Sequence, residues 1–347
     1  MPLEPERQII DITAKELLAI SHESRQRFID EAFTYWREKG FPYRQMSDME
    51  INKNFKKLSE TDTRTFFSNG KIIGSTVCLD LVNSFYPQIW SAARWGHLKS
   101  PIDHFYDDDT LKKLLERAIG LWPDRKCWCD YVVRSMFRIY SGGRVSNFRP
   151  TIAKAVIENF SENGSRVLDF CSGFGGRLLG TMSLDRHYVG IDPSVLHVNS
   201  NIQMFNAVGN EANCTVEFLQ DCAEEAMPKL HSGSFDLIFT SPPYFRQEKY
   251  TKDSNQSYLR YQNYDIWKKE FLTRVVEESA RLLTTNGYFV LNISDVRGYR
   301  LARDFEELAS KYFKLQKKYE LEMTARPLHR KNGIAHKSEP LFVYQKK

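Results

Sequence analysis

Beyond about residue 143, short apolar runs alternate with stretches of helical periodicity, and this alternation limits the possible folds most. Short apolar runs bounded by turn residues are typical of buried strands. Strands that alternate with helices indicate βαβ units, in which helices cover both faces of a parallel sheet. We therefore predict an α/β fold with a doubly wound, mostly parallel, seven-stranded sheet. Its strands are expected at residues 166–170, 187–191, 215–219, 235–240, 288–293, 319–323 and 341–344, the last two forming an antiparallel pair.

The first part of the chain has a mainly helical pattern. For example, Ser47 with Glu50 three residues later forms a capping box before an apolar-periodic run. The Ser-Gly-Gly sequence at residues 141–143 is the expected joint, and a length of 347 residues suits two domains. We predict a helical N-terminal domain at residues 1–143 and a second domain at residues 144–347.

Aromatic residues in the N-terminal part are interleaved with Lys and Arg. Such a mixture can stack on nucleic acid and neutralise its phosphates. Aromatic residues at this density are more often core residues, so both interpretations stay open. The residues concerned are Phe33, Tyr35, Trp36, Phe41, Tyr43, Trp90 and Trp95.

Bulk properties restrict the class of protein. The net charge of +5 permits a nucleic-acid partner without requiring one. No apolar stretch approaches the roughly 18 residues of a membrane span, and the start of the chain lacks the features of a signal peptide, so we expect a cytoplasmic protein with no membrane partner. Among six cysteines only Cys127 and Cys129 are close, and their spacing is not that of a zinc site, so we expect reduced thiols and no metal.

Three acidic residues follow three successive predicted strands. Asp169 precedes a turn containing Gly173 and Gly175, where the backbone can approach a ligand closely. The turn is not a phosphate-binding G-x-G-x-x-G sequence, and an acid there repels pyrophosphate but suits a cationic amine. Asp192 is placed to bind ribose hydroxyls, and Asp221 can accept from an adenine amino group. Together they predict an adenosyl ligand without phosphates, S-adenosylmethionine.

The sequence Ser241-Pro242-Pro243-Tyr244 directly follows the predicted strand at residues 235–240. Proline has no N–H and holds the preceding residue extended. The turn therefore presents the Ser241 hydroxyl and bare carbonyl oxygens, with the flat face of Tyr244 beside them. These groups suit a planar molecule that carries an amino group. The alternative is a proline-stiffened loop with a packed tyrosine.

From about residue 147 to residue 344 the sequence resembles the amino-group DNA methyltransferases, which modify adenine N6 or cytosine N4. The resemblance rests on Asn147-Phe148-Arg149-Pro150, on the three acids and on the Ser-Pro-Pro-Tyr tetrapeptide. It implies a Rossmann-like methyltransferase fold, S-adenosylmethionine as cofactor and catalytic residues at 241–244. The cofactor-binding residues that we expect are Asn147, Phe148, Asp169, Phe170, Cys171, Gly173, Gly175, Asp192, Pro193, Asp221 and Cys222.

The resemblance also implies direct methyl transfer without a covalent intermediate. The N–H groups of the target amine would donate to the Ser241 oxygen and the Pro242 carbonyl, and Ser241 could also donate to the adjacent ring nitrogen. Tyr244 would stack on a base that has flipped out of the duplex. Cys171 is expected to be a wall residue of the cofactor turn. Within the family, serine at position 241 slightly favours cytosine N4 over adenine N6.

DNA, a duplex with a flipped base, is thus the expected partner, in the restriction-modification setting that the family implies. Residues 1–143 and the polar, aromatic loop at 245–263 are the candidate recognition regions, although the loop can also be a solvated excursion. The basic turn at 326–331 can contact phosphate or simply be solvated. Two other classes of function remain open: an amino-methyltransferase for RNA or a protein side chain, and a non-catalytic module that binds an adenosyl group or nucleic acid.

Overall fold

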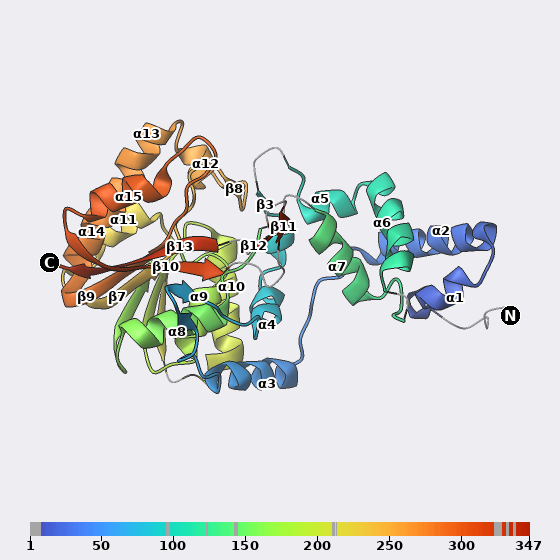
Figure 1. Cartoon of the computed structure of the whole chain (residues 1–347), viewed down its shortest axis with the longest axis horizontal. Coiled ribbons are helices and arrows are strands. Elements are labelled where there is room, and N and C mark those ends of the chain that lie inside the picture. The colour runs from blue at the N-terminus through green and yellow to red at the C-terminus, as the bar shows by residue number, and fades with distance from the viewer. Residues whose placement is uncertain are drawn as a thin grey trace. The chain divides into compact units, whose positions relative to one another are not determined.

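The computed structural model describes residues 8–94, 98–122, 124–141, 145–209, 212, 214–322, 328–330, 333–335 and 338–347. The chain forms two compact units, one of residues 1–45 and 87–145 and the other of residues 46–86 and 146–347. Figure 1 draws the elements of both. Gly142 and Gly143 of the predicted joint, Trp95, and both ends of the predicted basic turn lie outside the described residues.

The first unit is mainly helical, as predicted. It contains η1 (Ile9–Asp11), α1 (Ala14–Leu18), α2 (His22–Lys39), η2 (Pro87–Trp90), β3 (Ala93–Arg94), α5 (Pro101–Phe105), α6 (Asp108–Leu121) and α7 (Asp130–Tyr140). The apolar faces of α1, α2, α6 and α7 meet in one core that buries Trp36, Phe41 and Trp128. Two of the aromatic residues considered as nucleic-acid contacts are therefore core residues, whereas Tyr43 is 42% exposed.

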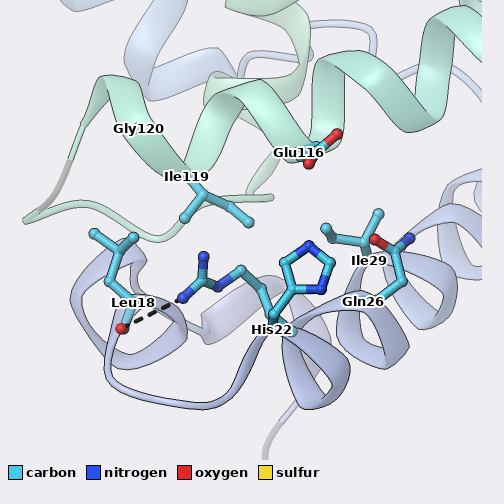
Figure 2. A pocket seen from close by; sticks show the side chains of 8 residues that line it. Leu18, His22, Gln26, Ile29, Glu116, Ile119 and Gly120 are labelled. Carbon is cyan, nitrogen blue, oxygen red and sulfur yellow. Dashed lines mark hydrogen bonds between the residues drawn. The ribbon is translucent and has the colours of Figure 1, made fainter.

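A small pocket of about 220 Å³ lies within the helical unit (Figure 2). Its apolar lining comes from Leu18, Ile29 and Ile119, with Glu116 from α6 facing His22 and its neighbours on α2. None of the site residues predicted from the sequence lines this pocket, so it is separate from the predicted chemistry.

The second unit is built on a large sheet. Its strands, in spatial order, are β1 (Phe67–Ser68), β2 (Lys71–Ile72), β10 (Phe313–Glu322), β13 (Ser338–Lys346), β9 (Leu283–Asn292), β7 (Phe235–Thr240), β4 (Arg166–Asp169), β5 (His187–Ile191) and β6 (Thr215–Leu219). β9, β7, β4, β5 and β6 run parallel, and β13 is antiparallel to both β9 and β10. The predicted α/β fold with a mostly parallel sheet is confirmed. The described residues give nine strands in place of seven because the hairpin β1–β2 joins the edge at β10.

The remaining elements of this unit are helices and short strands. They are α3 (Asp48–Ser59), α4 (Leu79–Ser84), α8 (Pro150–Phe160), α9 (Gly176–Met182), α10 (Val195–Val208), α11 (Ala223–Ala226), η4 (Met227–Lys229), β8 (Glu248–Lys249), α12 (Ser257–Arg260), α13 (Tyr264–Trp267), η5 (Lys268–Thr273), α14 (Arg274–Leu282), α15 (Leu301–Ala309), β11 (Leu328–Arg330) and β12 (Gly333–Ala335). Among the described residues, no helix is long and apolar enough to cross a bilayer.

Alternate residues of the central strands face two different cores, because side chains in a strand point to opposite faces. Leu168 and Ile238 belong to a core completed by α14 and α15. Their neighbours Val167 and Leu237 belong to a second core, completed by α8. Figure 1 shows α8 on one side of the sheet and α14 and α15 on the other. This two-sided burial explains why the strands read as continuous apolar runs.

Residues 46–86 belong to the same compact unit as the sheet, whereas the prediction placed them in the N-terminal domain. Lys154 on α8 is buried, and its Nζ donates to the carbonyls of Leu58, Ser59 and Thr61 at 3.1, 2.7 and 2.8 Å. The last carbonyls of a helix lack partners within the helix. One buried ammonium therefore closes the end of α3 and attaches it to α8.

Candidate active site

The predicted site residues lie at one edge of the sheet, where the carboxyl ends of β4, β5, β6, β7 and β9 meet. Thr240, the last residue of β7, donates through its Oγ1 to the Asp169 carboxylate at the end of β4, at 2.7 Å. β13 begins at the same edge, because its Leu341 pairs with Asn292 at the end of β9. In open α/β sheets, ligands bind outside the carboxyl ends of the strands.

Asp169 is fully buried, and protein groups surround its carboxylate. The Arg177 Nε donates to it at 2.8 Å, the Tyr188 hydroxyl at 3.0 Å and the Thr240 hydroxyl at 2.7 Å. The Arg177 guanidinium also donates to the Cys171 carbonyl at 2.5 Å. Through these contacts the buried Asp169 carboxylate connects the glycine turn to β7. Its assignment to the cofactor site stays a prediction.

The glycine turn has the backbone conformation that its sequence implies. Gly173 and Gly175 have φ of +51° and +68°, in the left-handed region that glycine tolerates. A Cβ on Gly175 would lie 2.0 Å from the Tyr86 hydroxyl, which itself donates to Asn201 Oδ1 at 2.6 Å. Tyr86 therefore packs directly against the turn and requires glycine at position 175.

Asn147 and Phe148 also contact the glycine turn. The Asn147 side-chain nitrogen donates to the Phe174 carbonyl at 2.7 Å. A Cβ on Gly176 would lie 2.1 Å from the Phe148 carbonyl oxygen, so the two backbones are in close contact. The Phe148 ring meets Phe239 edge-on, with 5.6 Å between ring centroids. The structure thus brings this segment to the turn, and its role toward the cofactor stays a prediction.

Asp192 links the turn to the start of α10. Its carboxylate accepts from the backbone N–H groups of Gly173 and Ser194, both at 2.9 Å, and from His197 Nδ1 at 3.1 Å. Burial alone would raise the pKa of Asp192, but the His197 ring and the backbone donors bring that pKa below its ordinary value. Among the described residues, the buried Ser194 Oγ and His197 Nε2 have no hydrogen-bond partner. Two polar atoms beside Asp192 can therefore still accept or donate.

Asp221 follows β6. Its carboxylate is partly exposed and forms an ion pair with a lysine. Lys229 Nζ is 2.8 Å away, and the hydrogen bond from Lys229 lowers the pKa of Asp221. The backbone N–H of Cys222 also donates to it, at 2.8 Å. The Cys222 thiol is buried, which raises its pKa to about 11. The structure shows no direct contact between Asp221 and the other two acids among the described residues.

Three further predicted cofactor residues lie along the same edge. The Phe170 ring is buried in the sheet core and packs near Phe289, with 6.4 Å between centroids. Cys171 is half-buried, and burial raises the pKa of its thiol well above the ordinary value. Pro193 is half-buried between Asp192 and α10. The role of Cys171 as a wall residue stays a prediction.

The tetrapeptide is held by residues from two other strands. The Ser241 Oγ donates to Asn292 Oδ1 at 3.4 Å. The Tyr244 hydroxyl lies 3.4 Å from the Asn292 carbonyl oxygen and 3.3 Å from Glu339 Oε2. Burial and the nearby Glu339 carboxylate raise the pKa of Tyr244 well above its ordinary value, so the phenol stays neutral. Ser241 and Tyr244 are half-buried, whereas Pro242 is buried.

The segment at residues 245–263 is not a plain excursion into solvent. Phe245 and Tyr261 are buried in the sheet core. Between them, Tyr250 lies against the glycine turn, 5.6 Å from the Phe174 ring and 6.3 Å from the His197 ring between centroids. The segment therefore links the tetrapeptide to the turn. Contact between this segment and nucleic acid stays a prediction.

Sequence analysis missed several residues that complete this edge. Asn292 ends an apolar strand in the parallel set, and a polar residue at that position was a signal that could have identified it. Tyr86 and Glu339 carried no such signal, because their partners are remote in sequence. Arg177 lies only eight residues after Asp169, but nothing in the sequence showed that the two side chains pair. Among the described residues, no group of three or more His, Cys, Asp or Glu side chains could hold a metal ion.

Comparisons with known proteins give one sequence match and several structural ones. No curated protein matches this chain in sequence. Among solved structures, a methyltransferase dependent on S-adenosylmethionine from Methanosarcina mazei is 15% identical, covers 55% of this chain and 96% of its own, and has a TM-score of 0.39. A methyltransferase from Pyrococcus furiosus is 16% identical over 57% of this chain and 82% of its own, also with a TM-score of 0.39.

A tRNA (m1A58) methyltransferase from Aquifex aeolicus is 12% identical over 58% of this chain and 70% of its own, with a TM-score of 0.39. Residues 235–347 match a family model described as DNA methylase, of the N6/N4 type. The matched residues begin with β7 and include the tetrapeptide, Asn292 and β13. The segment that carries Ser-Pro-Pro-Tyr is therefore similar in sequence to the DNA methylases.

Proposed function

We propose that this protein transfers a methyl group from S-adenosylmethionine to an exocyclic amino group of a DNA base. The base is cytosine, at N4, slightly ahead of adenine, at N6. The observation that carries the proposal is the hydrogen bond between Thr240 and Asp169. Thr240 directly precedes the tetrapeptide and Asp169 precedes the glycine turn, so this bond holds the two segments side by side. The DNA methylase match over residues 235–347 supports it.

The residues around the glycine turn fit S-adenosylmethionine. A Cβ on Gly173 would meet only the Cys171 carbonyl oxygen, at 3.7 Å, so space remains beside this backbone. Ser194 Oγ and His197 Nε2, both buried and without a partner among the described residues, suit the hydroxyls of a ribose next to Asp192. When bound, S-adenosylmethionine supplies an activated methyl group on a sulfonium.

The chain's own residues then place and polarise the amine. An exocyclic amine is a poor nucleophile because its lone pair is delocalised into the ring. Hydrogen bonds from its N–H groups to Ser241 Oγ and to the Pro242 carbonyl favour a pyramidal nitrogen with a localised lone pair. Tyr244 stacks on the base, a contact worth about 1–3 kcal/mol. Correct placement of reacting groups is itself a large part of such catalysis.

A duplex must open to bring a base to this edge, so the proposal includes base flipping. The helical unit and the segment at residues 245–263 are the proposed contacts with DNA. The mild positive charge of the chain is compatible with such a partner.

The test is mass spectrometry of nucleosides from DNA incubated with the protein and S-adenosylmethionine. We expect N4-methylcytosine or N6-methyladenine, formed about 100- to 1,000-fold more slowly when Ser241→Ala replaces the wild type. A parallel reaction with RNA, prepared from the same source as the DNA, is the control for the class of substrate. Methylated RNA with unmodified DNA would replace the DNA assignment by an RNA one, and no methylated nucleoside in either would overturn the proposed function.

A further inference from the structure

We propose that Asn292 is a positioning residue of the amine site, which fixes the Ser241 hydroxyl as a hydrogen-bond acceptor toward the substrate. The inference rests on the proposed function. It concerns a residue at the end of β9, a strand that is remote in sequence from the tetrapeptide. Asn292 is 2% exposed, so its side chain has no solvent to satisfy it.

The orientation of the Asn292 amide follows from its neighbours. Its Nδ2 lies 3.0 Å from the carbonyl oxygen of Pro340, on β13. A carbonyl oxygen can only accept a hydrogen bond, so the amide nitrogen must face Pro340. The amide oxygen, Oδ1, then faces Ser241 Oγ at 3.4 Å. The orientation of the Asn292 side chain is therefore set by the adjacent strand and does not depend on a bound substrate.

This orientation sets the polarity of Ser241. An amide oxygen has no hydrogen to donate, so the Ser241 hydroxyl hydrogen points toward Asn292. The lone pairs of Ser241 Oγ are left for another partner, and an acceptor in this position suits an N–H of an exocyclic amine. A hydroxyl whose hydrogen is already engaged is poorly suited to donate to a ring nitrogen. Ser241 thus recognises the amino group and not the ring beside it.

Asn292 also contacts the other end of the tetrapeptide, through its backbone. The Tyr244 hydroxyl lies 3.4 Å from the Asn292 carbonyl oxygen. Substitution of the Asn292 side chain leaves this backbone contact available. A substitution of the Asn292 side chain should therefore affect the reaction only by changing the position or orientation of the Ser241 hydroxyl. This dependence on Ser241 can be tested.

The experiment is a double-mutant cycle on the methyl-transfer rate, measured under single turnover with the nucleic acid that the wild type methylates. The variants are Asn292→Ala, Ser241→Ala and their combination, with Asn292→Leu as a second replacement that preserves side-chain volume. The control is Ser279→Ala in α14, which removes a buried hydroxyl that donates within its own helix, to the Val275 carbonyl at 2.6 Å. Thermal unfolding and the affinity for S-adenosylmethionine are measured for each variant.

We expect Asn292→Ala and Asn292→Leu to slow methyl transfer by about 10- to 100-fold, the scale at which misplacement of a reacting group costs rate. Cofactor affinity should not change, and Ser279→Ala should react like the wild type. When Ser241 is already alanine, the same Asn292 changes should have little further effect. Equal effects in both backgrounds, or a wild-type rate in both Asn292 variants, would overturn the inference while leaving the proposed function intact. If the wild type methylates no nucleic acid, the proposed function fails first and the inference falls with it.

Discussion

The glycine turn and the tetrapeptide lie at the same edge of one sheet, but their side chains are held very differently. At the turn, Asp169 has three donors at 2.7–3.0 Å, one of them the buried Arg177. At the tetrapeptide, Ser241 and Tyr244 have contacts of 3.3–3.4 Å. Hydrogen bonds between oxygens are usually 2.5–3.0 Å long. We call Asp169 and Asp192 with their donors the frame, and residues 241–244 the shelf. The frame is held by short hydrogen bonds, whereas Ser241 and Tyr244 on the shelf are held by longer ones.

Removing the centre of the frame should have the largest effect. Asp169→Ala leaves Arg177 buried without its partner, and loss of one member of a buried ion pair typically costs about 3–5 kcal/mol of unfolding free energy. Urea unfolding of the purified protein measures this loss. The matched control, Asp169→Leu with Arg177→Met, replaces the whole pair by apolar groups and should recover much of the stability. A loss below about 1 kcal/mol for Asp169→Ala, the size of an ordinary neutral hydrogen bond, would show that the frame is not held by this pair.

On the shelf, Ser241→Ala should leave stability almost unchanged but reduce methyl transfer. Removal of one preorganised polar group at a reacting centre costs about 100- to 1,000-fold in rate. The single-turnover rate measures the loss of methyl transfer, and equilibrium binding of S-adenosylmethionine measures any loss of cofactor affinity. An equal loss of cofactor affinity would contradict the separation between shelf and frame.

Tyr244→Phe tests how much the long hydrogen bonds on the shelf contribute. The ring proposed to stack on the base is retained, and the hydroxyl contacts to Asn292 and Glu339 are lost. We expect the rate to fall by about 2- to 10-fold, the scale of one weak hydrogen bond. Tyr244→Ala is the control, because it also removes the stacking ring and should be slower than Tyr244→Phe.

The smallest effect concerns the pH dependence of the frame. The pKa of Asp192 is lower in the folded chain than its ordinary value of 3.8, so its contribution to stability is present above that pH. It is lost as the pH falls through the lower folded value. Unfolding free energies of the wild type and of Asp192→Asn, measured at about pH 6 and about pH 3, should therefore converge at the acidic pH. A constant difference would exclude Asp192 as the titrating group.

The sequence predicted the sheet well because its signals are local. Runs at residues 187–191, 215–219 and 235–240 carry enough apolar character and turn chemistry to fix their bounds, which match β5, β6 and β7. The capping box of Ser47 and Glu50 is confirmed for the same reason. Acids at strand ends could be placed at one edge because parallel strands end together.

What the sequence did not reveal depends on pairs that are remote along the chain. The Ser241–Asn292 and Tyr244–Glu339 contacts span 51 and 95 residues. The ammonium of Lys154 reaches carbonyls 93 to 96 residues earlier. No period or spacing encodes such partners, so residues 46–86 could not be assigned to the sheet. The Asp169–Arg177 ion pair spans only eight residues, but the sequence does not show that both side chains are buried.

The attachment of residues 46–86 to the sheet has a practical consequence for dissecting the protein. Cleavage at residue 143 would not separate two foldable halves, because the C-terminal fragment would lack α3 and the edge hairpin β1–β2. Lys154 would also lose the carbonyls that it contacts. Any transplant of the helical unit between related proteins must therefore exchange two separate stretches and leave the intervening forty or so residues, 46–86, with their host.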